Sequence, residues 1–172
     1  MARFERALEV AESMANHRVL LTTTELIRLN NILTGKDPDS DADPWRKEPV
    51  TITLPSGNTE TLALIADPKV TAREKLHKAT EMAESGASVE SAVDAAVEIY
   101  TDLVLAYVFA DANRRTAVLA AHYFLARYGS TLSGIALHEI GLGDLREPGQ
   151  KESLRETVRQ MILFAARKGR KK

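Results

Sequence analysis

The chain has 172 residues, no cysteine and a formal net charge of −1 at pH 7. This length fits one domain with a sizeable core, and the lack of cysteine excludes disulfides, thiolate metal sites and cysteine nucleophiles. The balanced charge gives no overall attraction to nucleic acid, and no apolar stretch resembles a signal peptide or the ~20 residues of a membrane span. We therefore expect a single cytoplasmic domain over 1–172, with no membrane contact.

Apolar residues at helical spacing predict two N-terminal helices. The first covers about 3–16 and the second about 22–33. Thr22 and Glu25 have the form of a capping box at the start of the second helix, and Gly35 is a stop signal after it. We interpret both helices as part of the core.

Residues 36–49 form an aspartate- and proline-rich loop. Aspartates alternate from Asp37 to Asp43 and Glu48 lies eleven positions after the first, which imitates a calcium-binding loop. Such a loop needs glycine at its sixth position, where this chain has Ala42, and Pro44 removes a nearby N–H. The sequence therefore favours a solvated loop over a calcium site.

Residues 50–65 change from helical to alternating spacing. β-rich runs on either side of a Pro-Ser-Gly-Asn turn predict a hairpin, which we expect to be the only β element. Whether this hairpin only covers the core or offers a strand edge to a partner is left open by the residues themselves.

Helical spacing returns in the second half of the chain. Helices are predicted over about 71–85, over 89–107 with Ser88 as N-cap, over 113–128, over a short stretch at 133–140, and over 152–166. The four histidines fall on different elements without ligand spacing, so zinc is not expected. The basic tail, 167–172, is predicted to be a solvated, disordered end, although its charge would also suit nucleic acid.

Residues 107–117 read Y-V-F-A-D-A-N-R-R-T-A and link the two central helices. A tight loop that ends at a helix start presents free N–H groups, here those of Ala112, Asn113 and Arg114, to an anion such as phosphate. Arg115 would add a bidentate contact. The Asp111 carboxylate suits Mg²⁺, which usually takes one or two carboxylates together with substrate phosphates. Phe109 is predicted to be the buried peg of the loop.

The residues Phe109, Asp111, Asn113, Arg115 and Thr116 closely resemble the signature of the Fic/Doc family, H-x-F-x-(D/E)-(G/A)-N-(G/K)-R. The resemblance implies a mainly α, Fic/Doc-type helical bundle in which one β-hairpin, the flap, precedes the motif helix and pairs with a target protein. It also implies transfer of AMP or phosphate from ATP-Mg²⁺ to a protein hydroxyl. A separate antitoxin-like inhibitor is a further possible partner, since the nearest match to the family's inhibitory motif, at residues 80–85, ends in the wrong residue.

Three positions depart from the adenylylating members of that family. Tyr107 stands where the family has its histidine base, and a phenol is almost wholly protonated near neutral pH, whereas an imidazole is not. Arg114 replaces the motif glycine and Val118 replaces a second arginine; both changes resemble the Doc branch, which transfers the γ-phosphoryl group.

We therefore predict a Fic/Doc-like transferase scaffold of low or altered activity. Its catalytic positions would be Tyr107, Asp111 and Arg115, its nucleotide site residues 112–115, and its metal ligand Asp111. Two alternatives stay open: a catalytically inactive Fic-fold partner or regulatory protein, and a nucleic-acid-binding protein that uses the basic tail.

Overall fold

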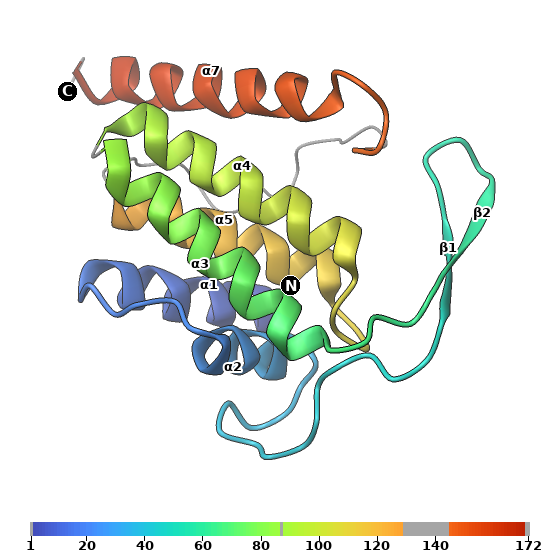
Figure 1. The fold of residues 1–172 in the computed structure, drawn as a ribbon. Coiled ribbons are helices and arrows are strands. Elements are labelled where there is room, and N and C mark those ends of the chain that lie inside the picture. Colours follow the sequence, from blue (N-terminus) through green and yellow to red (C-terminus); the bar gives the residue numbers. More distant parts are fainter. Residues whose placement is uncertain (1, 87, 129–144, 171–172) are drawn as a thin grey trace.

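Two helices, α4 (Val89–Ala106) and α5 (Asn113–Arg127), lie at the centre of the bundle. The computed structural model describes residues 2–86, 88–128 and 145–170. Helices α1 (Ala2–Asn16) and α2 (Thr23–Leu33) pack on α5, while α3 (Pro68–Gly86) and α7 (Gln150–Arg170) pack on α4 (Figure 1). The predicted mainly helical bundle is confirmed.

The burial of α5 explains its central position. Every residue from Thr116 to Leu125 is buried, so the helix is covered on all sides. A helix without a polar face belongs in the middle of a bundle, and its alanines let the neighbouring helices approach closely. The start of α5, where the predicted site lies, is therefore held in place by the core.

The hairpin is formed by β1 (Val50–Thr53) and β2 (Thr59–Leu62), which are antiparallel with Val50 opposite Leu62. Gly57 has φ +87° in the connecting turn, a conformation that glycine adopts without steric cost. The hairpin stands away from the helices (Figure 1), and its side chains are exposed or half-buried. This element was predicted correctly.

The helix starts follow local chemistry. The Thr22 hydroxyl accepts from the Glu25 N–H (3.4 Å), and Ser88 with Ser91 forms a complete capping box. Helix α3 begins at Pro68, three residues before the expected start at 71. Asp67 Oδ1 accepts from the Val70 N–H (3.1 Å), and proline in the first helical position loses no hydrogen bond, so capping extends the helix backwards.

Helix α7 extends further than its apolar pattern predicted. It begins at Gln150 and continues to Arg170, so residues 167–170 of the basic tail are helical, contrary to the expected disordered end. Three of its apolar residues are buried against the bundle: Leu154, Val158 and Ile162. The predicted short helix at 133–140 lies outside the described residues.

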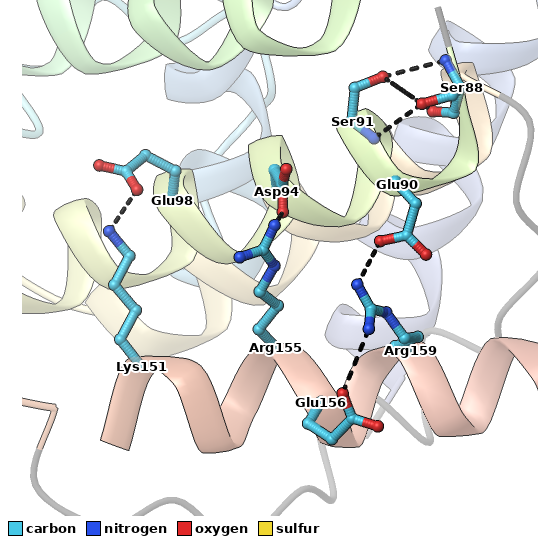
Figure 2. Close-up of polar contacts among 9 residues, drawn as sticks. All are labelled: Ser88, Glu90, Ser91, Asp94, Glu98, Lys151, Arg155, Glu156 and Arg159. Carbon is cyan, nitrogen blue, oxygen red and sulfur yellow. Dashed lines mark hydrogen bonds and ion pairs between the residues drawn. The ribbon is translucent and has the colours of Figure 1, made fainter. Parts of the chain in front are cut away.

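Charge also attaches α7 to α4. Three basic side chains of α7 pair with three acidic side chains of α4 at matching four-residue intervals (Figure 2). The pairs are Lys151–Glu98, Arg155–Asp94 and Arg159–Glu90. We call these six residues the α4–α7 ladder.

The aspartates of the 36–49 loop make turns and surface ion pairs. Asp37 Oδ1 accepts from the Asp39 N–H (2.8 Å), and Asp43 Oδ1 accepts from the Trp45 N–H (3.0 Å). Asp39 also pairs with Arg28 (3.3 Å). No cluster of three metal-ligating side chains occurs in the described ranges.

Candidate functional site

Two residues in the left-handed conformation mark the limits of the loop between α4 and α5. Tyr107 ends α4 with φ 52°, and Ala112 precedes α5 with φ 59°. Because a non-glycine residue in this region costs ~1–3 kcal/mol, the surrounding structure must hold both of them there. The sources of that restraint are the side chains described next.

Asn113 closes the loop from inside. Its Oδ1 accepts from the Phe109 N–H (2.9 Å), and its Nδ2 donates to the Phe109 carbonyl (2.9 Å). Asn113 is 5% exposed, so both bonds are shielded from water. The side chain of this predicted nucleotide-binding residue therefore stabilises the loop, which leaves its backbone N–H as the group that could contact a nucleotide.

A second amide fixes the loop from α2. Asn30 Nδ2 donates to the Asp111 carbonyl (2.9 Å) and to Thr116 Oγ1 (3.1 Å). The Thr116 hydroxyl in turn donates to the Ala112 carbonyl (2.7 Å). These buried bonds fix the direction in which the loop leaves the core.

Phe109 is the buried peg that the sequence predicted, and its partner is Trp45. The two rings stack with centroids 4.9 Å apart and planes at 11°. Their backbones run antiparallel: the Arg46 N–H donates to the Val108 carbonyl (2.9 Å), and the Ala110 N–H donates to the Pro44 carbonyl (3.0 Å). Residues 44–46 thus lie antiparallel to the loop in an isolated β-bridge.

The Arg46 side chain also reaches this region, and it was missed from the sequence. Its Nε donates to the Tyr107 carbonyl (2.7 Å), and the residue is only 6% exposed. An arginine in an Asp- and Pro-rich loop has the local pattern of a solvated residue. No signal short of the tertiary structure would have placed it here.

The start of α5 has no side-chain cap. The N–H groups of Asn113 and Arg115 donate to no acceptor among the described residues. The Ala112 N–H, expected to be free, donates instead to the Asp111 carboxylate (2.7 Å). An uncapped helix start of this kind attracts an anion.

Three charged side chains surround this helix start. Asp111 is exposed, and Arg115 is half-buried with no hydrogen bond or ion pair to any described residue. Arg114 is exposed, and its Nε donates to the Tyr100 hydroxyl (3.3 Å). Burial raises the pKa of Tyr100, which keeps that phenol protonated although Arg114 opposes the shift. The predicted site residues 111–115 therefore lie where the loop meets the first turn of α5.

Tyr107 lies next to Arg46. It is half-buried, with its ring centroid 6.0 Å from the Arg46 guanidinium carbon. Its hydroxyl forms no hydrogen bond with any residue in the described ranges. His122 lies elsewhere: it is buried in α5, and its Nε2 is 3.0 Å from Glu12 of α1, so it does not take the place of a base in the loop.

The nearest match to an inhibitory motif, at residues 80–85, is remote from this loop. Its acidic residue, Glu84, accepts a hydrogen bond from the Tyr128 hydroxyl (3.1 Å). Tyr128 follows the last residue of α5, whereas the loop precedes its first residue. Glu84 therefore sits at the opposite end of the bundle from Arg115.

The domain is mainly helical, and the uncapped start of its central helix α5 lies beside the exposed Asp111 carboxylate and the half-buried Arg115. This chain belongs to the Fic/DOC family, whose model matches residues 20–125. No curated protein sequence matches the chain.

A solved structure has a similar fold. It is a Fic domain containing signaling protein from Bacteroides thetaiotaomicron VPI-5482, with a TM-score of 0.62 and 18% sequence identity. The similarity covers 96% of this chain and 65% of that protein.

Proposed function

We propose that this chain is a Fic/Doc-like transferase scaffold that binds ATP-Mg²⁺ and transfers AMP or phosphate to a protein hydroxyl, with low or altered activity. The observation that carries the proposal is the uncapped start of α5, with Asp111 in the preceding loop and Arg115 in the first turn of the helix. Family membership makes nucleotide phosphates the expected anion.

Each residue of the loop has a defined task in this proposal. The N–H groups of Asn113 and Arg115 would hold phosphate oxygens, and the Arg115 guanidinium would add charge-assisted hydrogen bonds. Asp111 would hold Mg²⁺, which neutralises phosphate charge when bound. In this structure the Asp111 carboxylate accepts a hydrogen bond from the Ala112 N–H. Rotation of Asp111 toward the metal would break that bond and free the Ala112 N–H for a further phosphate contact.

Tyr107 determines how active the site is. The acceptor hydroxyl must lose a proton, and general-base help with such a step usually contributes ~10²–10⁴ in rate. No described residue hydrogen-bonds the Tyr107 hydroxyl, so nothing in the described structure activates it as a base. The same observation favours the second candidate, a nucleotide-binding or regulatory Fic-fold protein without transfer activity.

The hairpin is proposed to hold the protein target. Among the described residues its two strands pair only with each other, so within that part of the chain each has a free edge with backbone groups for a partner strand. Since Glu84 is engaged at the other end of the bundle, we propose that inhibition, where it occurs, comes from a separate antitoxin-like protein. Arg114 and Val118, as in the Doc branch, favour phosphate over AMP as the transferred group.

The test restores the missing base. Tyr107→His is expected to raise transfer to protein by ~10²–10⁴, measured with both α- and γ-labelled ATP. Tyr107→Phe is the matched control: unchanged residual activity means that the phenol only packs, and lost activity means that it takes part in catalysis. A histidine variant that binds ATP but labels no protein with either isotope would leave the inactive-partner candidate.

ATP binding is tested separately by calorimetry. Arg115→Ala is expected to weaken it about tenfold or more, because a charge-assisted hydrogen bond is lost. Arg73→Ala, an exposed arginine of α3, is the control. Equal affinities for wild type and Arg115→Ala would contradict the proposed site.

A further inference from the structure

We propose that Arg46 is a positioning residue that holds the hairpin in a fixed place relative to the 107–112 loop. The inference rests on the proposed function only in one respect, namely that the hairpin presents the target. Its structural content, a single buried guanidinium that joins two functional segments, stands on contacts within the described chain.

The Arg46 guanidinium reaches three separate segments. Nε donates to the carbonyl of Tyr107 in the loop (2.7 Å). One terminal nitrogen donates to the carbonyls of Glu48, before β1 (3.1 Å), and Leu62, at the end of β2 (3.3 Å). The other donates to the carbonyl of Ala63, after β2 (3.0 Å). One side chain therefore joins both ends of the hairpin to Tyr107, the C-cap residue of α4.

The backbone around Arg46 places the guanidinium there. The Arg46 N–H donates to the Val108 carbonyl, and the neighbouring Trp45 ring stacks on Phe109. Phe109 is part of the hydrophobic core and Trp45 packs against that core, so neither ring can shift without disturbing it. The anchor point of the side chain is thus rigid, and the hairpin is the part that it positions.

The hairpin has few other attachments. Its strands pair with each other, and neither packs closely on a described helix (Figure 1). The other polar attachment in the described structure joins Arg146 to Glu60 in the middle of β2, which leaves the hairpin ends to Arg46. Without Arg46, the hairpin would be attached mainly by the chain that leads into and out of it.

Only arginine suits this position. The planar group carries five N–H donors in a fixed fork, whereas a lysine ammonium is a point charge that cannot reach three segments at once. Arg46 is 6% exposed and has no carboxylate partner among the described residues, so within that part of the chain carbonyl oxygens alone satisfy its charge. Its loss leaves the carbonyls of Tyr107, Glu48, Leu62 and Ala63 without this donor.

The proposed role has a consequence for transfer. A hydroxyl held by the hairpin must reach a phosphate held by the loop, and a misplacement of about 1 Å can cost 10²-fold in rate. Loss of Arg46 is therefore expected to lower the transfer of the bound group while ATP affinity stays unchanged, because Arg46 contacts none of residues 111–115 through its side chain.

The test measures the hairpin directly. The chain has no cysteine, so spin labels can be placed at Asn58→Cys in the hairpin turn and Glu9→Cys in α1 without further changes. Pulsed electron spin resonance then gives the hairpin-to-helix distance distribution. Arg46→Gln and Arg46→Lys are expected to broaden it at least twofold, while a second label pair, Glu9→Cys with Glu74→Cys, keeps its width. Lys47→Gln, an exposed neighbour, is the control.

Each outcome decides the proposal. A hairpin distribution in Arg46→Gln as narrow as in wild type overturns it, as does equal broadening of the helix-to-helix pair. Should neither variant fold, the wild-type Arg46 Nε–H is followed by NMR: exchange about tenfold or more slower than for exposed Arg73 supports the proposal, and equal exchange overturns it. The spin-label distances can be measured in a protein without transfer activity. The absence of transfer in every variant would therefore contradict only the proposed function.

Discussion

The side chains of residues 107–115, the loop and the first turn of α5, divide into those that hold the loop in place and those that are available to a ligand. Asn113 and Phe109 are buried, and the Asn113 side chain hydrogen-bonds to the Phe109 backbone. Asp111, in contrast, is exposed, and Arg115 has no polar partner among the described residues. Substitutions in the first group should change stability, and substitutions in the second should change ligand binding.

Asn113→Ala is expected to destabilise the fold. The substitution leaves the buried N–H and carbonyl of Phe109 without partners, and each unsatisfied buried group costs ~1–3 kcal/mol. Denaturant unfolding measures the change in the free energy of unfolding. Arg115→Ala, which removes no described hydrogen bond, is the control and should stay within ~0.5 kcal/mol of wild type. Equal stability of Asn113→Ala and wild type would contradict the proposed closure of the loop.

Asp111→Ala is expected to remove the Mg²⁺ dependence of ATP binding while the fold stays intact. The carboxylate is exposed, and its described hydrogen bond is to the adjacent Ala112 N–H, so it contributes little to the core. Calorimetry with and without Mg²⁺ gives the dependence. Asp41→Ala, an exposed aspartate outside the loop, is the control. The assignment of the metal to Asp111 fails if the variant retains the wild-type Mg²⁺ effect.

At the scale of elements, α7 is joined to the bundle differently from α4 and α5. Those two helices are covered by apolar contacts, whereas α7 adds the three ion pairs of the α4–α7 ladder to a narrow buried stripe (Figure 2). Burial alone would raise the pKa of Glu98, but hydrogen bonds from Lys151 and Lys78 outweigh it, and the pKa lies below its usual value. This charged attachment makes the position of α7 sensitive to salt.

Arg155→Glu is expected to loosen α7 selectively, because it places two carboxylates together in the middle of the ladder. Amide exchange should accelerate in α7 and stay unchanged in the central part of α5. The swapped pair Asp94→Arg with Arg155→Asp restores opposite charges and should recover most of the protection. In wild type, 1 M salt should accelerate α7 exchange as well, since it shortens the screening length to about 3 Å. Equal acceleration in α5 and α7 would show that the ladder has no local effect.

At the scale of the whole molecule, local chemistry was readable from the sequence and long-range contacts were not. The two central helices, the hairpin, the caps at Thr22 and Ser88, and the loop between α4 and α5 follow from spacing and turn residues within a few positions. Contacts between Arg46 and Tyr107 join residues 61 positions apart. Nothing in the local sequence distinguishes such an arginine from a solvated one.

The α4–α7 ladder is a second long-range contact that the sequence did not predict. Acidic residues at 90, 94 and 98 and basic residues at 151, 155 and 159 are each visible as a four-residue repeat. A repeat of charges on one helix ordinarily means a solvated face, and only packing shows that two such faces meet. The side-chain role of Asn113 was hidden for a similar reason: a helix-start amide can serve a ligand or its own loop, and the sequence does not separate the two.

The stability of the whole bundle should depend on pH through His122, which joins α5 to α1. Burial lowers the pKa of this histidine, although the hydrogen bond that it donates to Glu12 opposes the shift, and its Nδ1 has no partner in the described structure. The unfolded chain, with an ordinary histidine pKa of about 6.5, then binds the proton more readily than the folded one. The contribution to stability is complete above about pH 6.5 and is lost as pH falls through that value toward the lowered folded pKa.

The measurement is the free energy of unfolding between pH 5 and 8 for wild type and His122→Gln, with exposed His17→Gln as the control. Wild type and His17→Gln are expected to lose stability below pH 6.5, with a slope of up to about 1.4 kcal/mol per pH unit for one proton. His122→Gln should lack this component, because an amide does not titrate there, while carboxylates shared by all three proteins cancel in the comparison. A His122→Gln curve parallel to wild type over this range would show that His122 is not the group that responds, and that the contact between α1 and α5 is insensitive to its proton.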